Sequence, residues 1–161
     1  MPNFSTQLCL RFILLISFIA IISALFIEYF LGHQPCNLCL IERIPYGITI
    51  ILIVSNFIIK INKKFLILSL FIIFIFSILV SFYHLGIEEG FFEESAICGI
   101  KDSEILISKE EILKQMNEKV ISCKDVTFKI FGLSLTSINI IISLLITIML
   151  IKVFISNEKN R

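Results

Sequence analysis

Long apolar stretches, separated by short polar segments, dominate the pattern along the chain. Each approaches or exceeds the roughly 20 residues that a helix needs to cross the hydrocarbon core of a bilayer. The predicted membrane-spanning segments are residues 12–31, 42–59, 65–85 and 133–155. In lipid each of them must be helical, because a helix satisfies its own backbone groups. We therefore predict an all-α integral membrane protein, built as a bundle of four transmembrane helices.

Two of these spans need a further argument. The first is not expected to be a cleaved signal peptide, because its apolar core is long and meets Glu28 and Tyr29 without a small-residue cleavage site. The second begins with Glu42 and Arg43, which we expect at the outer end of its helix. Short connections join the first three spans, so the chain is expected to form a single membrane domain, residues 1–161.

Cations in the short segments predict the orientation of the spans. They precede span one, fill the turn between spans two and three, and follow span four: Arg11, Lys60, Lys63, Lys64, Lys152, Lys159 and Arg161. Both termini are therefore expected in the cytoplasm. The outer loops, residues 32–41 and 86–132, are expected in the periplasm of a bacterium, on the side of the inner membrane where disulfides persist.

Composition agrees with the membrane class. Of the 161 residues, 57% are hydrophobic and 17% are charged, which is more apolar surface than a soluble domain of this size can bury. The formal net charge is +1, and no basic stripe or nucleic-acid motif is present. The chain therefore gives no reason to expect a nucleic-acid partner.

The second outer loop contains one clear helix signal. Ser108 followed by Glu111 is typical of a capping box. The apolar residues after it fall on one helical face: Ile112, Leu113, Met116 and Val120. We predict a short amphipathic helix on the membrane surface. A helix that covers the bundle without touching the membrane is an equally good interpretation.

Cys36 and Cys39 form a C-x-x-C motif in the first outer loop, beside span two. If a helix begins near Cys36, both sulfurs and the Arg43 guanidinium lie on one face of it. A helix N-terminus and a nearby arginine both favour a thiolate, so they lower the cysteine pKa and produce a nucleophile. Arg43 can also stabilise negative charge that develops on a bound electron acceptor.

Other readings of the cysteines remain. A C-x-x-C is often half of a zinc site, but here 24 residues separate Cys98 from Cys123, and the oxidising compartment favours thiol redox chemistry. We therefore expect no metal. Cys98 and Cys123 are either a structural disulfide, worth roughly 3 kcal/mol in the chain-entropy model, or a second redox couple that exchanges with the first. Cys9, on the cytoplasmic side, is expected to be a bystander.

His84 lies at the outer end of span three, after Tyr83. An imidazole at this depth can bond to, or exchange protons with, a polar head group. The alternative is an interfacial Tyr-His pair that anchors the helix.

Taken together, these motifs resemble the signature of the disulfide bond formation protein B (DsbB) family. The matching segments are residues 34–43 (QPCNLCLIER), 83–88 (YHLGIE), 98–99 (CG), 123–125 (CKD) and 131–134 (FGLS). The likeness covers nearly the whole chain. Thr127 and Phe128 replace the proline and tryptophan often found after the last cysteine, and Phe91 and Phe92 stand where tryptophan is common. These differences bear on partner choice more than on chemistry.

The resemblance implies an inner-membrane oxidase that reoxidises a soluble thioredoxin-like dithiol oxidase, DsbA, and passes the electrons to quinone, either ubiquinone or menaquinone. By position it implies redox-active disulfides Cys36–Cys39 and Cys98–Cys123, with the latter attacked by the partner and Cys39 facing the quinone. Arg43 matches the quinone-site arginine of the family, and His84 falls near a histidine implicated there.

Three rival functions are weighed against this one. A vitamin K epoxide reductase-like oxidase also combines a helical bundle, C-x-x-C and quinone, but carries the motif late in the bundle rather than after span one. A non-catalytic membrane protein could bind metal through the outer cysteines. A transporter subunit is disfavoured because no span has a central ionisable residue.

Overall fold

The computed structural model describes residues 4–59, 62–94, 98, 122–124, 128–130 and 132–159. Long helices account for most of this chain: α1 (Phe4–Tyr29), α2 (Asn37–Ile59), α3 (Lys63–Glu88) and α5 (Leu135–Lys159). Each is long and apolar enough to cross a membrane. The predicted four-helix membrane bundle is confirmed, while the amphipathic helix predicted after Ser108 lies outside the described residues.

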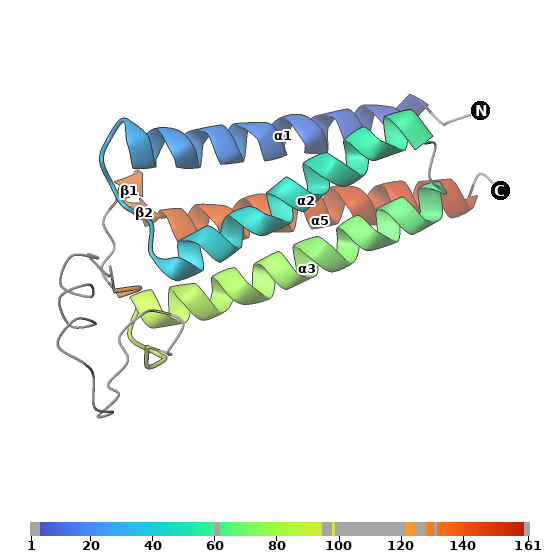
Figure 1. Cartoon of the computed structure of the whole chain (residues 1–161). Coiled ribbons are helices and arrows are strands. Elements are labelled where there is room, and N and C mark those ends of the chain that lie inside the picture. The colour runs from blue at the N-terminus through green and yellow to red at the C-terminus, as the bar shows by residue number, and fades with distance from the viewer. Residues whose placement is uncertain are drawn as a thin grey trace, which may run out of the picture.

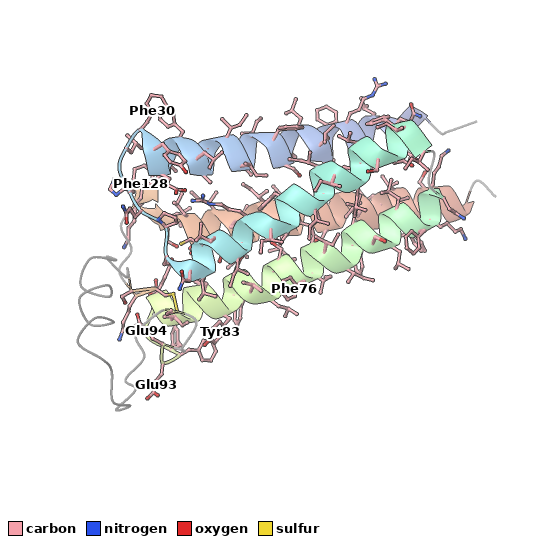
Figure 2. All side chains as sticks on the ribbon, viewed as in Figure 1. Phe30, Phe76, Tyr83, Glu93, Glu94 and Phe128 are labelled. Carbon is pink, nitrogen blue, oxygen red and sulfur yellow. A yellow bond between two sulfur atoms is a disulfide. The ribbon has the colours of Figure 1, made fainter. Side chains whose placement is uncertain are left out.

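The four helices lie side by side, with both termini at one end of the bundle and the cysteine-bearing segments at the other (Figure 1). α1 packs on α2, α2 on α3, α3 on α5, and α5 on α1, which closes the bundle. Most side chains on the outer faces are large and apolar; Phe76, for example, is 54% exposed and points away from the bundle (Figure 2). Such a surface is suited to lipid contact rather than to water.

A short β-hairpin leads into the last helix. β1 (Lys129–Ile130) pairs antiparallel with β2 (Leu133–Ser134), in the register Lys129↔Ser134 and Ile130↔Leu133. Gly132 in the connecting turn has a positive φ of 83°, a conformation that glycine adopts without strain. The hairpin was not predicted from the sequence, and it makes α5 begin at Leu135, two residues after the predicted start of span four.

The outer end of α3 folds back on itself. The backbone N–H groups of Phe91 and Phe92 both donate to the Gly86 carbonyl, at 2.7 and 3.0 Å. The Phe92 ring then stacks on Tyr83, with ring centroids 5.6 Å apart. A Cβ added at Gly86 would overlap the Phe92 ring, which would have to move. Glycine at this position therefore leaves room for the ring, which covers the end of the helix.

The bundle contains two separate apolar clusters. The larger one fills its centre and the end near the termini, where Ile13, Ile53 and Phe74 are fully buried. The smaller one lies at the opposite end and consists of Cys36, Leu38, Ile87, Cys98 and Cys123. Three of the five cysteines thus belong to this cluster, and Cys39 packs against it.

Candidate active site

Cys36 is the residue immediately before α2, which agrees with the assumption that a helix begins near Cys36 and extends the predicted span two by five residues. The Leu40 N–H donates to the Cys36 carbonyl at 3.2 Å, and the Cys39 N–H donates to the Cys36 Sγ at 3.3 Å. The sulfur therefore accepts from an N–H of the first turn, as the hydroxyl of an N-capping serine does. This position also exposes the sulfur to the positive end of the helix dipole.

The Cys36 and Cys39 thiols are free, and their Sγ atoms lie 2.8 Å apart. Cys36 is buried, whereas Cys39 is half-buried. The hydrogen bond from the Cys39 thiol lowers the pKa of Cys36 below its ordinary value, and contacts with His84 add to this effect against the opposing effect of burial. Within the pair, Cys36 is thus the more acidic thiol.

Cys98 and Cys123 are joined by a disulfide, with Cα atoms 5.5 Å apart. Both are almost completely buried, and both belong to the small cluster that contains Cys36. Glu94 holds the backbone beside Cys123, because its carboxylate accepts from the Ser122 hydroxyl and from the Lys124 N–H. Figure 2 shows the disulfide beside the outer end of α3. The two cysteine pairs are therefore brought together at one end of the bundle.

His84 lies between the dithiol and a buried carboxylate. Its Nε2 is 3.5 Å from the Cys36 Sγ, and its Nδ1 is 2.9 Å from Oε1 of Glu42. Nδ1 also lies 3.2 Å from the Thr136 hydroxyl, which in turn donates to Glu88 at 2.6 Å. The ring is 1% exposed. It is thus an internal partner of Cys36 rather than an interfacial anchor.

Further polar side chains continue this network into the bundle. Asn139 donates to Oε2 of Glu42 at 3.1 Å and to Ser81 at 2.7 Å. Its carbonyl accepts from the Tyr46 hydroxyl, which also lies 3.4 Å from Ser143. Glu42 and Tyr46 come from α2, Ser81 from α3, and Asn139 and Ser143 from α5. Bonds of this kind hold helices together in lipid, where apolar burial gives little advantage.

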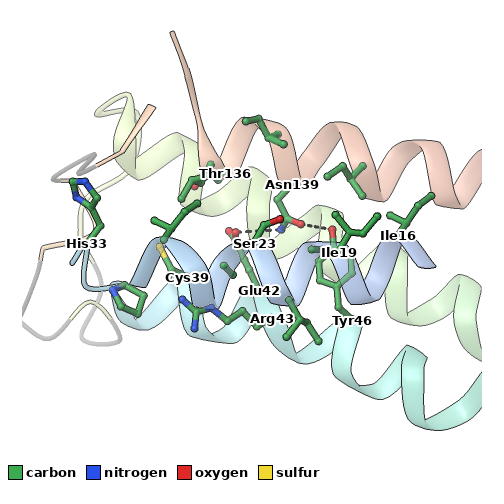
Figure 3. A pocket seen from close by; sticks show the side chains of 18 of the residues that line it. Ile16, Ile19, Ser23, His33, Cys39, Glu42, Arg43, Tyr46, Thr136 and Asn139 are labelled. Carbon is green, nitrogen blue, oxygen red and sulfur yellow. Dashed lines mark hydrogen bonds between the residues drawn. The ribbon is translucent and has the colours of Figure 1, made fainter. Parts of the chain in front are cut away.

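A cavity of about 340 Å³ lies beside this network, between α1, α2 and α5. Isoleucines and alanines of α1 line one side, and polar side chains from α2, α5 and the first outer loop line the other: His33, Gln34, Cys39, Glu42, Arg43, Tyr46, Thr136 and Asn139. Figure 3 shows Cys39, Glu42 and Arg43 at this polar side. Cys36 and His84 do not line the cavity, so among the predicted site residues only Cys39 and Arg43 face it.

Arg43 reaches the cavity while paired with a carboxylate. Its Nη1 lies 2.5 Å from Oε2 of Glu28 on α1, and each side chain is 22% exposed. The pair joins α1 to α2 near the cysteines. A fixed guanidinium at the wall of an apolar cavity can donate to a bound polar group without first being stripped of water.

The reduced dithiol also offers ligands for a soft metal. One ligand atom each from Cys36, Cys39 and His84 lies within 4.8 Å of the other two. Two thiolates and an imidazole are typical zinc ligands. The other couple is closed as a disulfide and cannot contribute thiolates, so a four-cysteine site is not formed in this structure.

Comparison with protein-family models matches residues 6–153 to the family described as "DsbB: Disulfide bond formation protein DsbB". The chain belongs to the DsbB family. It is also similar to Uncharacterized protein RP370 of Rickettsia prowazekii (strain Madrid E), with 31% identity over 151 residues, which cover 91% of this chain and 86% of that protein. The predicted DsbB-family resemblance is therefore confirmed.

DsbB-family membership makes this chain a multi-pass membrane protein of disulfide bond formation and a disulfide oxidoreductase with redox-active cysteines. Sequence reasoning had singled out Cys36, Cys39, Cys98, Cys123, Arg43 and His84, and all six lie at one end of the bundle. It missed Glu88, Thr136 and Asn139, and treated Glu42 only as a counter-charge to Arg43. An asparagine within an apolar span was the available signal, since such residues are costly in lipid.

Proposed function

We propose that this protein is the inner-membrane oxidase that reoxidises a soluble, DsbA-like dithiol oxidase in the periplasm and passes the electrons to quinone. The observation that carries the proposal is the position of the Cys36–Cys39 dithiol. Cys36 shares a buried cluster with the Cys98–Cys123 disulfide, while Cys39 lines the cavity. The dithiol thus lies between two sites. On one side is the Cys98–Cys123 couple, which a soluble partner can reduce, and on the other is the cavity, in which a lipid-soluble acceptor can bind.

The first half of the proposed reaction is thiol–disulfide exchange. A thiolate of the reduced partner attacks Cys98–Cys123, and the resulting mixed disulfide resolves to oxidised partner and a reduced pair. That pair then attacks the Cys36–Cys39 disulfide and reduces it. The attack falls on the Cys36 sulfur, which lies in the buried cluster with Cys98 and Cys123, and it releases the Cys39 thiolate beside the cavity. Since Cys98 and Cys123 are buried, the partner's attack requires local opening of this end of the protein.

The cavity fits a quinone head group in size and chemistry. Its volume, about 340 Å³, is within the range of roughly 300–1,000 Å³ typical of small-molecule sites. Its α1 wall is apolar apart from Ser23, and its opposite wall places Arg43 and Asn139 as donors. A bound quinone would supply a two-electron, two-proton acceptor that dissolves in lipid. Arg43 would hold its oxygen, and Cys39 would face its ring.

The proposed orientation places both termini in the cytoplasm and both cysteine pairs in the periplasm. It is supported by the cation pattern of the sequence. It also agrees with the position of the N- and C-termini, which lie at the same end of the bundle (Figure 1). Phe91, Phe92 and Phe128 lie among the described outer residues and offer aromatic contacts to a partner.

The purified full-length protein, mixed with a reduced thioredoxin-fold dithiol donor and a short-chain ubiquinone or menaquinone, tests this function. We expect one quinone to be reduced for each donor molecule that is oxidised. Replacing Cys36, Cys98 or Cys123 by serine should abolish turnover, whereas Cys9→Ser, in α1 at the far end, should retain it. Absence of donor-dependent quinone reduction by the unmodified protein would contradict the proposal.

A metal-binding function is the second candidate, favoured by the cluster of Cys36, Cys39 and His84. Stoichiometric zinc that survives dialysis of the reduced protein, together with no donor-dependent quinone reduction, would favour it over the oxidase.

A further inference from the structure

His84 is bonded in a way that fixes which ring nitrogen carries hydrogen. The Thr136 hydroxyl donates its hydrogen to Oε1 of Glu88, so toward the ring it can only accept. Nδ1 of His84 must therefore be an N–H that points to Thr136 and to Oε1 of Glu42. Nε2 is left as the ring atom that faces the Cys36 sulfur. In the neutral ring this atom is an acceptor, placed to take the thiol proton.

Glu42 connects the opposite side of the ring to the cavity. Its Oε1 accepts from His84, and its Oε2 accepts from Asn139, which is itself held by Ser81 and Tyr46. The residue is 8% exposed, yet it lines the cavity (Figure 3). A carboxylate fixed at both oxygens, in contact with a buried imidazole and an adjoining cavity, is more than a counter-charge for Arg43, whose nearest carboxylate is Glu28.

We propose that His84 and Glu42 form a proton relay that carries the Cys36 thiol proton to the cavity when the Cys36–Cys39 disulfide closes. Closing that bond removes two electrons and two protons from the dithiol, and a quinone in the cavity takes up both. When Cys36 ionises, its proton passes to Nε2 of His84, and when the disulfide closes, Nδ1 releases a proton to Oε1 of Glu42, from which it enters the cavity. The proton of Cys39 leaves directly, since Cys39 lines the same space. His84, which touches the reacting sulfur, acts as the catalytic base, and Glu42 acts through it.

Glu88 is the competing carboxylate, and geometry disfavours it. Its Oε1 lies 3.8 Å from Nε2 of His84, beyond hydrogen-bond distance, and on the same side of the ring as Cys36. Glu88 does not line the cavity, and its Oε2 has no partner among the described residues. It can bias the charge of the ring, but a proton that it received would not reach the cavity. Among the described residues, the ionisable groups near the His84 ring are Cys36, Cys39, Glu42 and Glu88.

The relay rests on the proposed oxidase function, so its test uses two measurements. In the first, reduced protein is mixed rapidly with quinone, and closure of the Cys36–Cys39 bond is followed by quenching with an alkylating agent. Glu42→Gln should slow closure by at least about tenfold, since general acid–base catalysis typically contributes roughly 10²–10⁴-fold. Glu42→Asp should recover part of the rate. The matched control Glu89→Gln, on an exposed residue next to α3, should stay within about twofold of wild type.

The second measurement needs no quinone. The pH midpoint of Cys36 alkylation in the reduced protein should rise in Glu42→Gln and in His84→Gln, because each change weakens the partner that accepts the thiol proton. Glu89→Gln should leave the midpoint unchanged. Equal closure rates and equal midpoints for Glu42→Gln and Glu89→Gln would overturn the relay. If wild type fails to reduce quinone, the oxidase proposal falls, while the alkylation midpoints still decide whether Glu42 acts on Cys36 through His84.

Discussion

Cys36 and Cys39 lie one helical turn apart at the start of α2, yet they face different surroundings. The Cys36 sulfur is buried, 3.5 Å from Nε2 of His84, in the cluster that holds the Cys98–Cys123 disulfide. Cys39 lines the cavity between α1, α2 and α5. The helix thereby gives each sulfur of the motif its own neighbour, and this division underlies the predictions that follow.

Cys39→Ser is expected to separate the two halves of the reaction. The Cys98–Cys123 disulfide remains available for exchange, so the variant should oxidise about one equivalent of donor and then stop, because Cys36 alone cannot form the second disulfide. Donor oxidation and quinone reduction, followed in the same sample, check this. Multiple turnovers by the variant would show that Cys39 has no such role.

The acidity of Cys36 is expected to depend on Cys39. The thiol hydrogen bond from Cys39 is the main cause of the lowered Cys36 pKa. The reduced wild-type protein should therefore be alkylated at Cys36 with little change in rate between about pH 6 and pH 9, where an ordinary thiol loses reactivity as pH falls. Cys39→Ala should raise the pKa and restore a steep dependence in that window. Cys39→Ser keeps a hydroxyl donor and should have the smaller effect; identical profiles for both variants would contradict this cause.

Arg43→Ala is expected to weaken quinone binding. The variant removes the one guanidinium that lines the cavity and leaves Glu28 without its described partner. We expect the apparent KM for quinone to rise about tenfold, equivalent to roughly 1.4 kcal/mol, with a smaller change in kcat. Arg11→Ala, an exposed residue at the other end of α1, is the control. An unchanged KM would exclude Arg43 as a quinone ligand.

Gly86→Ala is expected to loosen the outer end of α3. The new Cβ would overlap the Phe92 ring, which must swing away and lose its contact with Tyr83. Because the ring can move, the loss in free energy of unfolding should be near the lower end of overpacking effects, about 1 kcal/mol. Thermal unfolding and the rate of Cys98–Cys123 reduction by dithiothreitol measure it. Gly47→Ala, where nothing lies within 4 Å, should change neither.

The four membrane spans could be predicted because each depends on one segment alone. Hydropathy and length identify a membrane helix without knowledge of its neighbours. The first residue of a helix is harder to place: span two was predicted from residue 42, whereas α2 begins at Asn37. The β-hairpin before α5 was missed, since two-residue strands at Lys129 and Leu133 leave almost no periodic signal.

The buried network could not be predicted in the same way. His84, Glu42 and Asn139 come from three helices, and their contact depends on how far each helix is rotated and raised in the bundle. Sequence reasoning placed His84 at the outer end of its span and near a bound quinone. Its side chain contacts Cys36 and Glu42 and does not line the cavity, and a role beside quinone stays a prediction.

Buried hydrogen bonds between polar side chains join α2, α3 and α5 to one another, whereas α1 takes little part in this network. Its described ion pair with another helix joins Glu28 to Arg43, near the outer surface. Its other contacts with the bundle are mainly apolar, although Thr6 and Ser17 are also buried. A bilayer competes for such contacts on nearly equal terms. We therefore expect α1 to be the wall of the cavity that moves most easily, so that a hydrophobic molecule would enter from the side of the acyl chains.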